Sequence, residues 1–266
     1  MRDTHSAKSG FSLVELSIVL VILGLLTGGI LAGQSLIRAS ELRAVISEFQ
    51  KYQSAVNTFK DKYFALPGDM TNATSFWGLL GGNATADDPT CNAIAATDTK
   101  TCNGNGNGII DAYDEARFWQ HLANAGLIEG QYTGVYGATG ATLIIPGTNM
   151  ARSKLGSAAF WQPQWEGTHS GEATRFDSSW QYGNSFFFSD WQTTWKANLT
   201  PAEAWNMDKK LDDGIPYSGR IVNTWGAFYS NSGEACTTAT SSADFTATYN
   251  LGASGKNCQA YFVNAF

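Results

Sequence analysis

Asparagine, glycine and aspartate recur over residues 103–114 in a pattern that suits a bound metal ion. Oxygen-bearing side chains fall at loop positions 1, 3, 5, 9 and 12, and a glycine at position 6 allows a sharp turn. The backbone carbonyl of position 7 adds another oxygen. This is the spacing of the twelve-residue calcium loop of an EF-hand. The predicted Ca²⁺ ligands are Asn103, Asn105, Asn107, Ile109, Asp111 and Asp114.

Two departures weaken the calcium interpretation. Asparagine replaces aspartate at all three early positions, and Asp114 is shorter than the glutamate that usually binds Ca²⁺ through both oxygens. We therefore expect weak affinity, suited to the high calcium concentration outside cells. The alternative is an Asn-Gly turn followed by an acidic helix N-terminus, which the helix dipole favours.

A second acidic cluster follows a predicted helix over 201–211. Thr200 and Glu203 form a capping box with a proline at the first helical position. Asp208, Asp212 and Asp213 then lie near the C-terminal end of the helix, where the dipole disfavours negative charge. A bound cation, a facing basic side chain or plain solvation of the turn would each relieve this.

The four cysteines fall into two local pairs, Cys91 with Cys102 and Cys236 with Cys258. Neither pair has the spacing of zinc or thioredoxin chemistry. In an exported protein we expect two short-loop disulfides, although four cysteines allow three connectivities and free buried thiols are the alternative.

Catalytic chemistry finds little support. The chain has three histidines, and His121 lies in a predicted amphipathic helix, where we interpret it as a surface or hydrogen-bonded structural residue. No nucleophile elbow, phosphate loop or zinc-protease motif occurs. We expect a protein that is not an enzyme.

Several tryptophans lie close together in the sequence: Trp161, Trp165, Trp180, Trp191 and Trp195. They are either core residues or part of a glycan-binding face.

An apolar segment near the N-terminus predicts a membrane-spanning helix. The 22 residues from Leu16 to Ile37 carry no charge, and as a helix they would span about 33 Å, enough to cross a bilayer. The alternative is a secretory signal peptide, but the run is longer than the ~7–15 residues usual there and has no closing cleavage site. A carboxylate, Glu15, lies at its start.

The helical pattern continues beyond the apolar run. Apolar residues recur at steps of three and four, with charged residues between them, among them Glu48. This indicates one helix from Phe11 to about Tyr63 whose second half packs an apolar stripe on a globular head. The expected stripe is Leu42, Val45, Ile46, Phe49, Tyr52, Val56 and Phe59.

The segment from Ser9 to Leu16, Ser-Gly-Phe-Ser-Leu-Val-Glu-Leu, resembles the prepilin peptidase site of type IV pilins and type II secretion pseudopilins. The resemblance implies cleavage between Gly10 and Phe11, methylation of the new N-terminal amine, and pairing of Glu15 with the N-terminus of a neighbouring subunit. Many pilins have a proline at the position of Ala32, where this chain departs from the family. Residues 62–70 and 211–216 resemble stretches in one branch of pilin-like proteins.

The resemblance also implies the surroundings of the protein. The expected partners are copies of the chain, other pilins or pseudopilins, a prepilin peptidase and an inner-membrane assembly platform. We expect a single pass through the inner membrane with the leader in the cytoplasm and the head outside, then a filament. A type II secretion pseudopilin, or a minor tip pilin or adhesin with a calcium-stabilised, tryptophan-rich head, is the alternative.

The expected fold is α+β and pilin-like, with the long helix on a small antiparallel sheet enlarged by loop insertions. The expected divisions are a leader (1–10), the membrane half of the helix (11–37), its amphipathic half (38–64) and the head (65–266). Short strands are predicted at 141–145, 185–189, 220–224 and 260–264. Residues 83–100 and 237–255 read as polar surface loops.

Composition agrees with an exported, loop-rich head. Only 15 % of residues are charged, and the net charge is −6. The acidic balance argues against nucleic acid binding, which needs a basic patch. Glycine, serine, threonine and asparagine supply the polarity instead, so copies can pack side by side with little like-charge repulsion.

Overall fold

The computed structural model describes residues 12–136, 144–156, 158–166, 182–190, 197–223, 235–239, 244 and 246–266. The described chain begins with helix α1 (Leu13–Tyr63). Contacts divide the chain into two compact units, residues 1–43 and residues 44–266, and each is described by itself. The second unit contains the end of α1, the sheet and the other helices.

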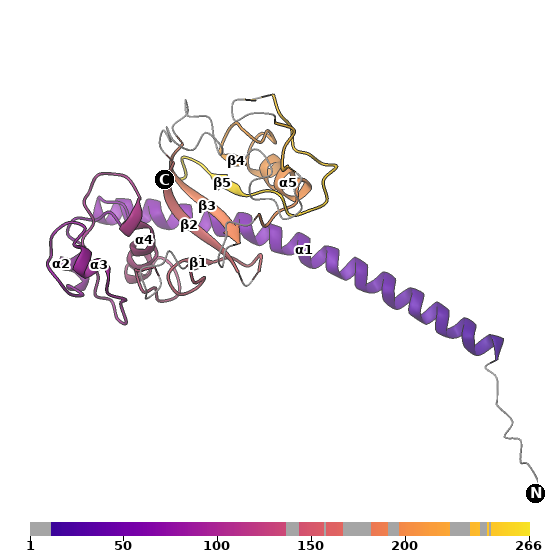
Figure 1. The fold of residues 1–266 in the computed structure, drawn as a ribbon. Helices are drawn as coiled ribbons and strands as arrows, with labels where there is room; N and C mark the ends of the chain where they lie inside the picture. Colours follow the sequence, from indigo (N-terminus) through magenta and orange to yellow (C-terminus); the bar gives the residue numbers. More distant parts are fainter. Residues whose placement is uncertain are drawn as a thin grey trace, which may run out of the picture. The chain divides into compact units, whose positions relative to one another are not determined.

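The second unit is built on a five-stranded sheet in which every neighbouring pair is antiparallel (Figure 1). The spatial order is β1-β2-β3-β5-β4, so the C-terminal strand lies inside the sheet. The strands are β1 (Ala151–Arg152), β2 (Ala159–Glu166), β3 (Gly183–Asp190), β4 (Ile221–Asn223) and β5 (Ala260–Phe262).

The C-terminal part of α1 packs on this sheet through aromatic side chains. The Phe49 ring stacks on Phe262 of β5 with centroids 4.5 Å apart, and Tyr52 meets Trp161 of β2 edge to face at 5.9 Å. Such rings bury large apolar areas and dominate core energetics. The buried positions of this segment are Val45, Glu48, Phe49, Tyr52, Ala55, Val56 and Phe59. The α+β, pilin-like fold expected from the sequence is confirmed.

The burial of Glu48 differs from the expected pattern of the helix. The sequence places it among the charged residues between the apolar positions, but its side chain is buried on the core side. Its carboxylate accepts hydrogen bonds from Ser153 Oγ (2.6 Å), the Lys154 backbone N–H (2.9 Å) and Trp161 Nε1 (3.0 Å). Three donors compensate for the water that the carboxylate loses on burial.

The strands agree with the sequence only in part. The segments 185–189, 220–224 and 260–264 overlap β3, β4 and β5, although residue 224 lies outside the described residues. Of 141–145, only Ile144 and Ile145 are described, and neither is in a strand. The sequence missed β1 and the eight-residue β2, which contains Pro163.

Four shorter helices complete the described part of this unit: α2 (Ala73–Trp77), α3 (Pro89–Asn92), α4 (Ala112–Asn124) and α5 (Pro201–Leu211). The capping box predicted for α5 is present, since Thr200 and Glu203 bond reciprocally. Helix α3 lies within the segment 83–100, which was predicted from the sequence to be a polar surface loop.

Both predicted disulfides form. Cys91 pairs with Cys102 and Cys236 with Cys258, with Cα atoms 5.9 and 4.9 Å apart.

Trp161 is fully buried, so it cannot be part of an exposed glycan-binding face. Trp180, Trp191 and Trp195 lie outside the described residues.

Candidate functional site

The first unit presents an apolar surface along α1. Every large apolar side chain from Leu13 to Ile37 is exposed, with Val19 and Ile22 at 51 % and Leu13 at 86 % at the extremes. By length and composition this helix can cross a membrane. A helix that exposes such a surface needs lipid or other helices around it.

Glu15 folds back on the start of this helix. Its Oε2 accepts a hydrogen bond from the Ser12 backbone N–H at 2.9 Å, and Ser12 Oγ accepts one from the Val14 N–H at 3.3 Å. This reciprocal pattern is close to a capping box and places a carboxylate at the positive end of the helix dipole. Gly10 and Phe11, the predicted processing residues, lie outside the described residues.

In the second unit, the asparagine-rich loop is fixed at both ends. It starts next to the disulfide at Cys102. Its far end lies against the sheet, where Asn184 accepts from the Ile110 N–H (3.1 Å) and donates to the Gly108 carbonyl (2.9 Å). The Trp165 N–H donates to the Ile110 carbonyl at 2.8 Å. Helix α4 then begins, as the sequence predicts.

The three asparagines play different parts. Asn103 is buried; its Oδ1 accepts from the Thr74 N–H (2.9 Å) and its Nδ2 donates to the Ala84 carbonyl (2.9 Å). Asn105 and Asn107 instead make turns inside the loop, because each Oδ1 accepts from the N–H two residues ahead. Asn105 and Asn107 therefore shape the loop, whereas Asn103 connects it to neighbouring segments.

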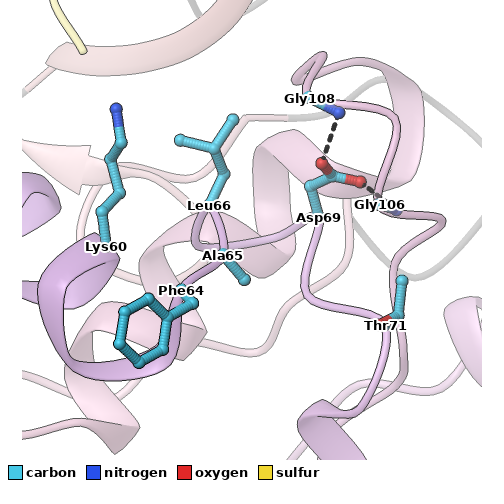
Figure 2. A pocket seen from close by; sticks show the side chains of 8 residues that line it. All are labelled: Lys60, Phe64, Ala65, Leu66, Asp69, Thr71, Gly106 and Gly108. Carbon is cyan, nitrogen blue, oxygen red and sulfur yellow. Dashed lines mark hydrogen bonds between the residues drawn. The ribbon is translucent and has the colours of Figure 1, made fainter.

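A residue that the sequence did not predict, Asp69, organises the loop. Oδ1 of Asp69 accepts from the Gly106 N–H (2.5 Å) and the Asn107 N–H (3.1 Å), and Oδ2 accepts from the Gly108 N–H (2.8 Å). Figure 2 shows the Asp69 carboxylate pointing at the amides of Gly106 and Gly108. Burial raises the pKa of Asp69, while the three N–H donors act in the opposite direction. Successive backbone amides of this kind form an anion-binding concavity.

Asp114, the last predicted ligand, is buried beside Asp69. Only 2 % of the residue is exposed, and Oδ2 has no hydrogen-bond partner. Burial, and then the charges of Asp69, Asp87 and Asp111, raise the pKa of Asp114 to about 8. Burial and the charge of Asp87 also raise the pKa of Asp111. Four carboxyl groups thus interact around the loop.

The N-terminal region is similar to a known processing motif. Residues 5–31 match the family model described as the prokaryotic N-terminal methylation motif. This motif marks the type IV pilin and pseudopilin family. No curated protein and no solved structure is significantly similar to the chain. The chain thus combines this motif with a pilin-like fold, and the motif suggests a structural, non-enzymatic protein.

In this pilin-like protein, His121 is a structural residue of the head. Its Nδ1 accepts from the Gly68 N–H (2.9 Å), and its Nε2 lies 2.9 Å from Thr101 Oγ1. Since Nδ1 is an acceptor, the proton belongs on Nε2 and the ring is neutral. Burial, followed by the charge of Arg117, lowers the pKa of His121 to about 3.

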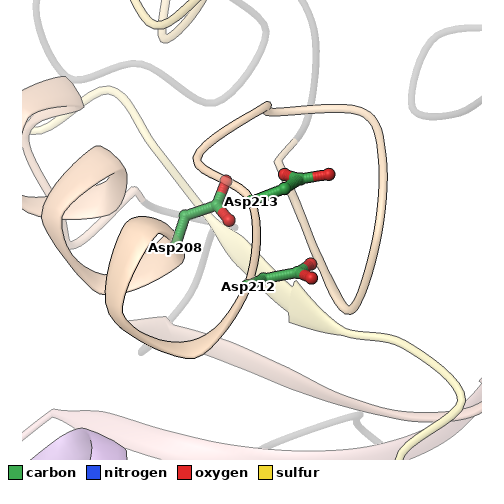
Figure 3. Close-up of side chains that lie close together, drawn as sticks. All are labelled: Asp208, Asp212 and Asp213. Atoms are coloured by element: carbon green, nitrogen blue, oxygen red, sulfur yellow. The ribbon is translucent and has the colours of Figure 1, made fainter.

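The second acidic cluster brings its three carboxylates together in the pilin-like head. Ligand oxygens of Asp208, Asp212 and Asp213 lie within 4.8 Å of one another, so the group could hold a metal ion (Figure 3). Its oxygens also serve the turn after α5: Asp208 accepts from Gly214 N–H and Tyr249 Oη, and Asp212 from the N–H groups of Arg220 and Ile221. The turn is explained without an ion.

A pocket of about 500 Å³ adjoins Asp69. It is lined by Lys60, Phe64, Ala65, Leu66, Asp69, Thr71, Gly106 and Gly108 (Figure 2). Phe64 follows the last residue of α1 and adopts a left-handed backbone conformation with φ of 53°, and the residue is 93 % exposed. No sequence pattern predicts this pocket, because its walls come from two segments about 40 residues apart.

Proposed function

We propose that this chain is a structural subunit of a type IV pilus-like filament. The observation that carries the proposal is the methylation motif at residues 5–31, followed by the exposed apolar surface of α1 from Leu13 to Ile37. A prepilin peptidase would cut between Gly10 and Phe11 and methylate the Phe11 amine. The apolar half of α1 would then hold the subunit in the membrane and, after extraction, in the filament core.

The proposal divides the chain into a leader (1–10), an assembly helix (11–37), an amphipathic helix (38–64) and an exported head (65–266). Basic residues in the leader favour its cytoplasmic placement. The head would therefore lie outside the inner membrane, and the subunit would join copies of itself or other pilins on an assembly platform. Two disulfides in the head suit an oxidising compartment.

Glu15 would pair with the Phe11 amine of a neighbouring subunit. A carboxylate within a bilayer costs at least about 2.5 kcal/mol, so a partner amine in the filament would favour assembly. In the isolated chain, the Ser12 N–H occupies one Glu15 oxygen. That contact would hold the carboxylate at the helix start until a neighbour arrives.

Mass spectrometry of the native N-terminus tests the processing step. We expect a mature chain that begins at N-methylated Phe11. A chain that retains residues 1–10, or begins elsewhere, would overturn the proposal.

The assembly role of Glu15 is tested with Glu15→Leu. We expect normal leader removal but fewer and shorter filaments, seen by electron microscopy of sheared material. Glu41→Gln is the matched control, because it removes one carboxylate from the same helix outside the apolar run. Normal filaments from Glu15→Leu would contradict the pairing.

A secretion pseudopilin and a minor tip adhesin are the alternative functions within the family. Immunogold labelling of intact cells separates them. Labelling along long surface fibres supports a major pilus subunit, labelling only at tips supports an adhesin, and cell-bound signal that disappears with loss of secretion supports a pseudopilin.

We also propose that the loop 103–114 binds one Ca²⁺ ion. The supporting observation is the orphaned Oδ2 of Asp114, buried among other carboxyl groups. The sequence assigns the site to Asn103, Asn105, Asn107, the Ile109 carbonyl, Asp111 and Asp114. Thermal melts of the full chain with Ca²⁺ and with EDTA test it: a higher melting temperature in Ca²⁺ is expected, and identical curves would contradict the site.

A further inference from the structure

Asp69 lies inside the loop for which the calcium site is proposed, although it comes 34 residues before Asn103 in the chain. A carboxylate offers about four lone-pair positions. Three are used by the N–H groups of Gly106, Asn107 and Gly108, two on Oδ1 and one on Oδ2. One position on Oδ2 therefore remains for a further ligand.

Asp114 lies against Gly68, the residue that precedes Asp69. The chain passes Asp114 at Gly68, where an added Cβ would lie 2.5 Å from the Asp114 carbonyl oxygen and 3.2 Å from its Cβ. Only glycine fits there, and it brings the next residue, Asp69, beside Asp114. One Asp114 oxygen is bonded to the Asp111 N–H, and Oδ2 is left buried and unpartnered.

Asp87 supplies charge from a third segment. Its Oδ2 accepts from Asn105 Nδ2 at 2.6 Å, and its backbone N–H donates to the Asn103 carbonyl at 3.1 Å. It interacts electrostatically with Asp69, Asp111 and Asp114. In the described part of the chain no salt bridge to any of these four aspartates is found. The four carboxylates therefore repel one another, and Asp114 has a buried oxygen without a partner, so a cation between Asp69 and Asp114 would offset their charge.

Asn103 does not face this cluster. Both polar atoms of its side chain are already bonded, to Thr74 and Ala84, and these residues are outside the loop. The oxygen that loop position 1 should provide is therefore directed elsewhere, and Asp69 occupies the interior of the loop in its place.

We propose that a split site binds the Ca²⁺ ion, with Asp69 in the ligand position that the sequence pattern gives to Asn103 and Asp87 as an outer charge. This inference rests on the proposed calcium function of the loop. Since Asp69 is six residues beyond the end of α1, the ion would fasten the loop to the turn that leaves this helix. Metal binding would thus stiffen the wall of the pocket beside Phe64.

Calcium titration of the full chain in detergent, after removal of metals with EDTA, tests the assignment. We expect Asp69→Asn to weaken Ca²⁺ binding by about tenfold or more, because affinity depends on ligand charge. Asn103→Asp should give no gain, whereas a true ligand at loop position 1 would bind more tightly as a carboxylate. Asp98→Asn is the matched control and should bind as the unaltered chain does.

A measurement on the unaltered chain covers the case in which Asp69→Asn does not fold. Amide hydrogen exchange should slow in Ca²⁺ both at residues 66–70 and at 105–111. Protection confined to 103–111, or tighter binding by Asn103→Asp, would overturn the role of Asp69 while leaving the loop site intact. No calcium binding by the unaltered chain would overturn the calcium proposal itself.

Discussion

At the scale of single residues, the His121 imidazole connects helix α4 to the turn after α1 through its bond from the Gly68 N–H. Protonation of Nδ1 would break that bond and leave a charge in a fully buried site. Because the folded pKa is about 3 and the ordinary value about 6.5, the unfolded chain binds the extra proton first. His121 therefore removes stability as pH falls below about 6.5, and not above it.

We predict that this loss approaches about 1.4 kcal/mol for each pH unit between 6.5 and 3. Chemical unfolding of the full chain and of His121→Gln across this range measures it. The difference between the two chains isolates the imidazole, because the carboxyl groups with raised pKa values, among them Asp114 and Asp208, are present in both. A difference independent of pH would contradict the prediction.

The contribution of Glu48 to stability also depends on its hydrogen-bond partners. Glu48→Ala would leave the Trp161 indole N–H and the Ser153 hydroxyl buried without their acceptor. We predict a loss of about 2–4 kcal/mol in the free energy of unfolding, measured by urea denaturation. Asp61→Asn, an exposed acid on the same helix, is the control and should change stability by less than about 0.5 kcal/mol.

At the scale of elements, strand β2 explains why the sequence missed part of the sheet. Proline is normally excluded from the middle of a strand, because it cannot donate to the ladder. Here β1 covers only Phe160 and Trp161, so the rest of that edge is open to the loop. Trp165, two residues beyond Pro163, turns its N–H away from β3 to the Ile110 carbonyl. Pro163 faces the same edge, where β3 needs no donor.

The Cys91–Cys102 disulfide fixes the start of the asparagine-rich loop, because Cys102 directly precedes Asn103. Replacing both cysteines with serine should lower stability by about 3 kcal/mol, the entropy of an 11-residue loop closure. The Cys236/Cys258 double variant should lose a similar amount. Only the first pair adjoins the proposed calcium loop, so we predict that only its loss reduces the Ca²⁺-dependent rise in melting temperature.

At the scale of the whole molecule, every residue of the described hydrophobic core comes from 45–266, whereas all the large apolar side chains at 13–37 are exposed. We predict that a chain starting at Arg38 folds without detergent into a monomer, while the full chain needs detergent. Light scattering with near-ultraviolet circular dichroism measures both. An aggregated or unfolded fragment would show that the apolar segment is needed for the head to fold.

The sequence by itself determined the features that depend on neighbours along the chain. The apolar run and Glu15, the helix to Tyr63, the capping box at Thr200 and the start of α4 all follow from local periodicity and caps. The two disulfide pairs could also be predicted, because the cysteines of each pair are close together in the sequence.

Only the tertiary structure decided which distant residues share a site. Asp69 reaches the loop because Gly68 permits close contact with Asp114, and no spacing rule links residues so far apart. Glu48 is buried because Ser153 and Trp161, about a hundred residues later, supply donors. Periodicity reports which face of an element is apolar, but the partners of a buried charge come from other segments, and these are set by the fold.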